Sequence, residues 1–184
     1  MTPGQQLALA AVAALAAAGA AKRGSVNRRG CTIWPINPDD YDYGAEYPGD
    51  RDVYDVMGDV DRLFREAGVR PSNAEEHYLA CMDDDGVVLG GAVYGYYEQD
   101  FEGVRFTFSV VVDPKARRRG IAGDLVRELE DVAKLLEDAY ELPVKMVAWV
   151  VNPNMAKLLD KMGFESTAYN GEWSREDPYY EKEL

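Results

Sequence analysis

The chain has 184 residues, 47% of them hydrophobic, and carries 20 lysines and arginines against 33 aspartates and glutamates, for a formal net charge of −13. This length and hydrophobic content suffice to bury one good core, so the sequence predicts one domain plus an extension. A strongly acidic surface repels nucleic acid, whose binding requires cationic groups that neutralise phosphates. We therefore exclude nucleic acid as a partner and favour amines and other cations.

Cysteine and histidine are too few to predict a metal site or a framework of disulfides. The chain has two cysteines, Cys31 and Cys81, and one histidine, His77. None of these residues stands at a metal-ligand spacing, so we expect no bound metal. A reducing compartment is the default for such a chain, which predicts a cytoplasmic protein.

Residues 1–21 contain no charged side chain, and residues 7–21 comprise ten alanines, three leucines, one valine and one glycine. A helix of this length spans about 22 Å, which is short of the ~30 Å hydrocarbon core of a membrane. A secretory signal has a lysine or arginine before its apolar run, and this segment has none. We interpret the segment as a helix that packs in an oligomer or larger assembly, with membrane contact as an alternative.

A basic linker over residues 22–30 follows, and it is either a flexible tether or a contact for an anionic surface. These features divide the chain into an extension, residues 1–30, and a domain, residues 31–184. Residues 31–36 are expected to form a short strand that ends at Pro35 and Pro38. Residues 39–61 contain nine acidic side chains and one base, Arg51. They form either a solvated acidic surface or an approach for a cationic amine.

The remaining elements follow from hydrophobic periodicity and turn residues. Apolar residues from Val53 to Phe64 predict a helix that ends near Gly68. Residues 78–82 and 87–94 read as strands joined by a hairpin turn at Asp83–Gly86. A strand over 106–112, a helix over 121–139, a strand over 144–151, a short helix up to Gly163 and a final hairpin complete the chain. This order predicts a mixed α/β sheet.

A glycine-bearing loop joins the strand over 106–112 to the following helix. It contains three consecutive arginines, Arg117 to Arg119, and then Gly120. The first N–H groups of a helix lack intrahelical partners, so a loop of this kind suits a pyrophosphate. Residues 112–122, VDPKARRRGIA, resemble the V-x-P-x-x-[RQ]-x-x-G-x-[GA] signature of the GNAT family of acyl-CoA-dependent N-acetyltransferases.

A second segment strengthens the resemblance. The strand over 144–151, Asn152 and the pair Gly163–Phe164 resemble the N-(x)n-Y-x-x-x-G-F segment of the same family. The two signatures cover residues 104–165, and the preceding hairpin extends the likeness back to about residue 32. The resemblance implies the GNAT fold (α/β, or α+β), a mostly antiparallel sheet whose fourth and fifth strands splay where the pantetheine of acetyl-CoA inserts.

The resemblance also implies a reaction and a set of cofactor-binding residues. Acetyl-CoA would transfer its acetyl group to a small amine or a protein amino group by direct attack in a ternary complex. Backbone groups around Val110 and Val112 would bind the pantetheine arm. The pyrophosphate and the following part of the cofactor would be held by Arg117, Arg118, Gly120, Ala122, Gly123 and Asn152, with Asn154 as an alternative to Asn152.

The chain departs from the family at two catalytic positions. Leu159 stands where many members have a general-acid tyrosine, and Phe106 stands where some have a glutamate. Among the carboxylates just before that strand, Glu98, Asp100 and Glu102, we select Glu98 as the base, and Tyr169 as the spare phenol. Each is alternatively a solvated acid or a packed aromatic. The alternative function is a structural or virion-associated protein that retains the fold, and CoA binding, with little or no catalysis.

Overall fold

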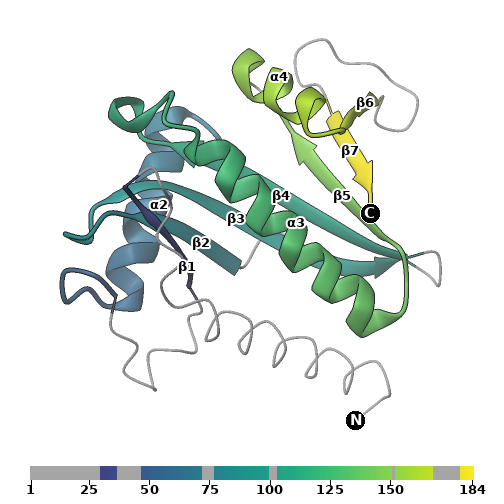
Figure 1. Ribbon diagram of the computed structural model, residues 1–184, viewed down its shortest axis with the longest axis horizontal. Helices are drawn as coiled ribbons and strands as arrows, with labels where there is room; N and C mark the ends of the chain where they lie inside the picture. The colour runs from purple at the N-terminus through teal and green to yellow at the C-terminus, as the bar shows by residue number, and fades with distance from the viewer. Residues whose placement is uncertain (1–29, 37–46, 72–76, 100–102, 151, 168–178) are drawn as a thin grey trace.

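The computed structural model describes residues 30–36, 47–71, 77–99, 103–150, 152–167 and 179–184. They form one mixed sheet of seven strands in the order β1-β2-β3-β4-β5-β7-β6, as Figure 1 shows. The helix and linker expected in residues 1–29 lie outside the described residues. None of the helices in the described ranges is long and apolar enough to cross a membrane.

The strands are β1 (Thr32–Ile36), β2 (His77–Met82), β3 (Val88–Gln99), β4 (Gly103–Val112), β5 (Val144–Trp149), β6 (Glu165–Thr167) and β7 (Tyr179–Glu183). The helices are α2 (Val53–Ala67), α3 (Ile121–Tyr140) and α4 (Pro153–Lys161). Neighbouring strands pair antiparallel except β4 and β5, which pair parallel. The prediction of a mixed, mostly antiparallel sheet flanked by helices is confirmed.

The observed strands differ from the predicted ones at two places. β3 and β4 form one long hairpin whose pairing runs from Gly90 opposite Val112 to Gln99 opposite Gly103, well beyond the predicted ends at residues 94 and 106. β1 continues through Pro35, which pairs with Leu79. Because β1 lies at the edge of the sheet and pairs with β2 alone, a proline that lacks an N–H is tolerated there. Sequence patterns do not reveal which strand lies at an edge.

Two helices cover opposite faces of the sheet. α2 buries one side, with Val56 and Val60 fully inaccessible, against a cluster that includes Val93 of β3 and Val111 of β4. This helix begins at Asp52, whose carboxylate accepts a hydrogen bond from the Asp55 N–H at 2.8 Å, and ends at Gly68, as the sequence predicted. The α2 face and the α3 face are therefore distinct sides of one sheet.

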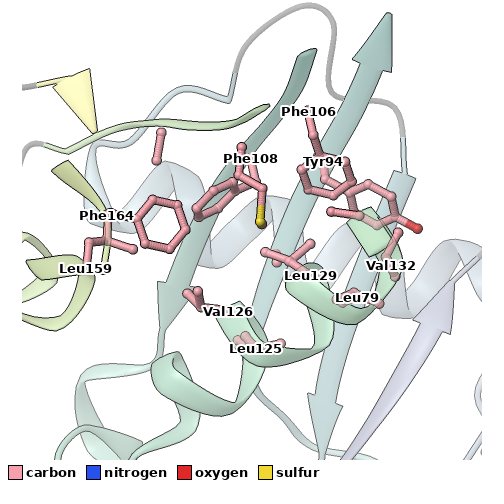
Figure 2. Close-up of a cluster of buried hydrophobic side chains, with 14 of the residues drawn as sticks. Leu79, Tyr94, Phe106, Phe108, Leu125, Val126, Leu129, Val132, Leu159 and Phe164 are labelled. Carbon is pink, nitrogen blue, oxygen red and sulfur yellow. The ribbon is translucent and has the colours of Figure 1, made fainter. Parts of the chain in front are cut away.

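The α3 face carries the larger core, shown in Figure 2. An aromatic row crosses the strands here: the rings of Tyr94 and Phe106 lie 5.3 Å apart, and those of Phe108 and Phe164 lie 5.8 Å apart. Leu125 and Leu129 of α3 pack against this row and are fully buried. Aromatic rings bury large areas, so this row is a major source of the stability of the fold.

The expectation that the cysteines form no disulfide is wrong. Cys31 and Cys81 are bonded, with their Cα atoms 5.7 Å apart and a sequence separation of 50 residues. The pairing of β1 with β2 sets Ile33 opposite Cys81 and so brings Cys31 within reach of that strand. Two cysteines this far apart in sequence meet only because of the strand register, which the spacing alone could not show.

Candidate active site

The parallel pair β4 and β5 separates part of the way along its length. The Cα register runs from Val104 opposite Val144 to Thr107 opposite Val147. β4 continues to Val112 beyond this last pair, and β5 continues to Trp149. Figure 1 shows the two strands together at one end and apart at the other. We call this place the β4–β5 fork; backbone groups of β4 beyond Thr107 have no β5 partner in the described register.

Val110 and Val112, the residues predicted to face a pantetheine arm, lie on β4 beyond the fork. They pair with Ala92 and Gly90 of β3 on the other side of the strand. The carbonyl of Val112 also accepts a hydrogen bond of 3.4 Å from the Nε of Arg117. The fork therefore leaves one edge of β4 available to an extended ligand, because a strand edge presents unpaired N–H and C=O groups.

The loop between β4 and α3 contains two residues with left-handed backbone conformations. A short 3-10 turn, Pro114–Ala116, follows β4, and Asp113 caps it by accepting a hydrogen bond of 2.7 Å from the Lys115 N–H. Arg118 and Gly120 both have positive φ, +64° and +81°. Left-handed residues in a turn direct neighbouring backbone N–H groups to one side, which is the geometry of anion-binding concavities.

Gly120 is the N-cap of α3, and no side chain caps the helix there. The first N–H groups of α3, a helix of 20 residues, therefore remain available to an anion. Arg117 and Arg118 are exposed beside them, and Ala122 lies in the first helical turn. The Arg119 guanidinium instead lies beside Gly30, which precedes β1. A Cβ built on Gly30 would be 3.1 Å from the Nη2 of Arg119.

Two of the other predicted cofactor residues have identifiable roles in packing. Gly123 is buried, and a Cβ built there would lie 3.6 Å from Leu158 of α4, so this glycine lies at the approach of α3 to α4. Asn152 is the N-cap of α4, and its Oδ1 accepts a hydrogen bond of 2.9 Å from the Asn154 N–H. The Asn152 amide oxygen is therefore occupied by the cap of α4.

The structure places neither predicted catalytic side chain. Glu98 lies on β3 opposite Val104, but its side chain is outside the described part of the structure, and so is the whole of Tyr169. Leu159 and Phe106, which occupy the family's tyrosine and glutamate positions, are fully buried in the α3-face core. Neither position could receive a reacting amine without rearrangement of that core.

Tyr94 and Tyr96 on the α3 face are poorly suited to act as bases. Burial, followed by the nearby Tyr96 and Glu128, raises the pKa of Tyr94, and burial followed by Tyr140 raises the pKa of Tyr96. Their rings stack against His77, with centroids 5.2 Å and 5.7 Å away respectively. A tyrosine with a raised pKa stays protonated at neutral pH and can donate a hydrogen bond but cannot accept a proton.

Two acidic side chains in the described part of the 39–61 stretch, Asp59 and Asp61, serve the local structure. Asp59 lies 2.8 Å from Arg51 and 2.9 Å from Arg62. Burial raises its pKa, but hydrogen bonds and charges from the two arginines outweigh burial and lower it overall. Asp61 accepts a hydrogen bond of 3.2 Å from the Tyr78 hydroxyl, and burial together with Asp61 raises the pKa of Tyr78 to about 12.

Sequence reasoning missed a group of side chains on the α2 face beside the fork. Arg105 of β4 donates a hydrogen bond to the hydroxyl of Tyr179 on β7, and its guanidinium carbon lies 5.3 Å from the centroid of the same ring. Trp149 at the end of β5 packs edge-on against Tyr179, with centroids 5.3 Å apart, and is 44% exposed. The signal in the sequence was a single arginine within an otherwise uncharged strand.

The forked sheet and the uncapped glycine loop together define a fold of the acyl-CoA-dependent acyltransferase class. The family model described as Acetyltransferase (GNAT) family matches residues 41–164. The chain therefore belongs to the GNAT acetyltransferase family, and by class it is an N-acetyltransferase that uses acetyl-CoA. A search of curated proteins found no match.

Solved structures agree on the fold. A putative acyl-CoA N-acyltransferase from Klebsiella pneumoniae has a TM-score of 0.54 and 14% identity, with 85% of this chain and 99% of that chain covered. Arabidopsis thaliana NAA60 in complex with a bisubstrate analogue has a TM-score of 0.53 and 16% identity, with 84% and 97% covered. Arabidopsis Naa50 in complex with the bisubstrate analogue CoA-Ac-MVNAL has a TM-score of 0.50 and 14% identity, with 83% and 98% covered.

Proposed function

We propose that the chain transfers an acetyl group from acetyl-CoA to a primary amine by direct attack in a ternary complex. The observation that carries this proposal is the combination of the β4–β5 fork with the uncapped N-terminus of α3 at Gly120. The bisubstrate analogues bound to the two Arabidopsis enzymes support the choice of donor and of an amino group as acceptor.

The loop of residues 117–123 would hold the pyrophosphate by charge and by backbone N–H groups. Arg117 and Arg118 would supply positive charge, while Gly120 and Ala122 would supply N–H groups at the start of α3. Gly123, which is buried near Leu158 of α4, would complete this loop. The nitrogen of the Asn152 amide remains a candidate contact for the same cofactor.

In the reaction, the amine nitrogen would attack the thioester carbonyl carbon, the C–S bond would break, and the CoA thiolate would leave and take up a proton. The free β4 edge beyond Thr107 would place an N–H near the carbonyl oxygen, where it stabilises the developing negative charge. The family's glutamate and tyrosine positions hold Phe106 and Leu159, so the amine would lose its proton to solvent, or to a peripheral group such as Glu98, before it attacks, with Tyr169 as the spare phenol.

Binding of acetyl-CoA to the loop is tested with Gly120→Val. A β-branched side chain at φ +81° is strained, and it would also obstruct the N–H groups that face the phosphates. We expect a folded variant that acetyl-CoA no longer stabilises against heat, whereas saturating ligand stabilises the natural chain.

Gly68→Val is the matched control, because Gly68 also has a positive φ of +68° and a Cβ built there meets nothing within 4 Å. It ends α2 on the opposite face of the sheet. This variant should lose stability from the same backbone strain and still bind acetyl-CoA. Unchanged acetyl-CoA affinity in Gly120→Val would show that the cofactor does not use this loop.

A further inference from the structure

Arg105 is a half-buried cation that pairs with no carboxylate in the described part of the chain, in a protein whose net charge is −13. Its partner in the structure is the neutral Tyr179, through one hydrogen bond and one cation–π contact. Within the part of the chain that the structure describes, no ion pair involves Arg105. The neighbouring Lys145, by contrast, pairs with Glu183 at 3.2 Å and Glu181 at 3.8 Å.

The strand register puts this cation at the β4–β5 fork. Arg105 precedes Thr107, the last β4 residue paired with β5, by two positions and therefore lies on the same face. Tyr179 pairs with Trp149, which lies two positions beyond Val147 on that face. Arg105 therefore lies where β4 and β5 are still paired, and Tyr179 lies beyond their last pair, Thr107 and Val147. The contact between Arg105 and Tyr179 spans the point where the two strands separate.

This face is opposite to that of α3. The even-numbered residues of β4 and β5 nearby, including Phe106 and Met146, belong to the α3-face core, so Arg105 and Trp149 project from the other side. A donor held at the start of α3 would reach through the fork, and an acceptor would approach its thioester from the side of Arg105. The exposed indole of Trp149 gives that side an apolar surface next to the cation.

We propose that Arg105 binds a carboxylate of the acceptor, so that the acceptor is a free amino acid rather than a simple cationic amine. This inference rests on the proposed acetyl transfer and names the substrate class for it. A guanidinium presents a planar fork of donors that matches a carboxylate, and a half-buried site strengthens the charged hydrogen bonds. Arg105 donates one hydrogen bond to Tyr179, and a guanidinium has five N–H donors.

A carboxylate bound by Arg105 makes the expected acceptor a free amino acid, whereas the acidic composition of the chain alone favours a simple cationic amine. Long-range attraction by a charge of −13 favours a cation, but attraction at long range does not select a functional group. A single charged contact in a desolvated site does select a functional group. An acceptor that lacks the carboxylate would leave the Arg105 cation unpaired. We therefore expect the local contact to decide between acceptors that carry the same amino group.

The test measures kcat/KM for the twenty common L-amino acids and for their C-terminal amides, with the full chain and acetyl-CoA. We expect the best amino acid to react about tenfold to 100-fold better than its amide. In Arg105→Met this ratio should fall to near one, mainly through a higher KM for the amino acid, while Arg105→Lys should retain part of it. Comparing ratios between variants cancels the different basicities of the two amines.

Lys145→Met is the control, since it removes the adjacent cation on the same face and should leave the ratio unchanged. A purely structural role for Arg105, in which it only holds β7 against β4, would lower the rates for amino acid and amide equally and would overturn the proposal. A natural chain that reacts equally with both would overturn it too, while leaving acetyl transfer intact.

If no amine reacts at all, the proposed transfer fails, and binding decides the inference separately. Calorimetric titration of the CoA-loaded chain with the same amino acids and amides should show binding of an amino acid that Arg105→Met abolishes. Inorganic phosphate serves as a further probe: equal competition by phosphate and by acetate would show a general anion site in place of a carboxylate site. Absence of binding by every amino acid would overturn the inference.

Discussion

Adjacent glycines in β3 set how closely both helices approach the sheet. A Cβ built on Gly90 would lie 3.0 Å from Ile121 of α3, and one built on Gly91 would lie 2.7 Å from Val60 of α2. Because successive residues of a strand face opposite sides, these two positions admit one helix on each face. Ile121 is the first residue of α3, so the Gly90 contact also fixes where the loop before α3 ends.

Gly91→Ala should destabilise the protein by about 1–3 kcal/mol, because the added methyl group overpacks the buried Val60 and forces α2 away from the sheet. Gly58→Ala is a matched control on α2 itself, since a Cβ there meets nothing within 4 Å. Replacing an unhindered helical glycine by alanine should stabilise the protein by about 0.5–1 kcal/mol. Urea unfolding of both variants measures the difference; a Gly91→Ala variant as stable as the natural chain would refute the packing.

At the scale of elements, Lys182 of β7 joins three parts of the fold. Its Nζ lies 2.8 Å from Glu130 of α3 and donates a hydrogen bond of 2.8 Å to the carbonyl of Met162 at the end of α4. It also lies 5.5 Å from the centroid of the Phe164 ring. β7, α3 and α4 are thus held together around one partly buried ammonium group on the α3 face.

Lys182→Met should cost about 1–3 kcal/mol, because it leaves the Glu130 carboxylate, whose side chain is only 13% exposed, without its cation. Lys134→Met is the control, because Lys134 and Asp131 form an exposed pair at 3.9 Å that contributes little. Chemical unfolding of the two variants provides the comparison. Equal losses of stability would mean that the Lys182 contacts do not join these elements.

The predictable parts of the fold were those with a local cause. Apolar spacing located α2 and α3, turn residues located the hairpin at Asp83–Gly86, and glycine chemistry located the loop before α3. The insertion of β7 between β5 and β6 has no such local signal, because it depends on pairing between segments far apart in sequence. For the same reason, the meeting of Arg105 with Tyr179 was not predicted, although the isolated charge in β4 was visible.

At the scale of the whole molecule, the disulfide between Cys31 and Cys81 ties the first strand to the sheet. A cross-link that closes a loop of about 50 residues is expected to stabilise the folded chain by about 4 kcal/mol, through the lost entropy of the unfolded chain. Both cysteines are buried, at 3% and 0% exposure, so the bond lies inside the core rather than on its surface.

We expect reduction of this bond to lower the melting temperature by about 10 °C, measured by thermal unfolding with and without reductant. The control is the double variant Cys31→Ala, Cys81→Ala, whose melting temperature should not depend on reductant. Mass spectrometry after thiol labelling reports the bond directly. Two free thiols per chain in the untreated protein, with no change on reduction, would contradict the disulfide.

This N-acetyltransferase has leucine and phenylalanine at the two positions where its family usually places a catalytic acid and base. Leu159 and Phe106 contribute to the core, so we expect the acceptor to lose its proton to solvent or to a peripheral group such as Glu98. General acid and base groups contribute about 10²- to 10⁴-fold to such reactions. The pH dependence of acetyl transfer therefore reports whether a well-placed general acid and general base exist elsewhere in the site.

The most direct measurement is amine-dependent release of CoA from acetyl-CoA by the full chain, followed from pH 6 to pH 10 with amino acids, polyamines and lysine peptides. We expect slow transfer whose rate keeps rising with pH, because an amine with a pKa of about 10 becomes nucleophilic only as it loses its proton. A fast reaction with a bell-shaped profile would contradict the absence of a placed acid and base. Tight binding of acetyl-CoA without release of CoA to any amine would contradict the enzymatic function itself and favour a structural protein that retains the fold.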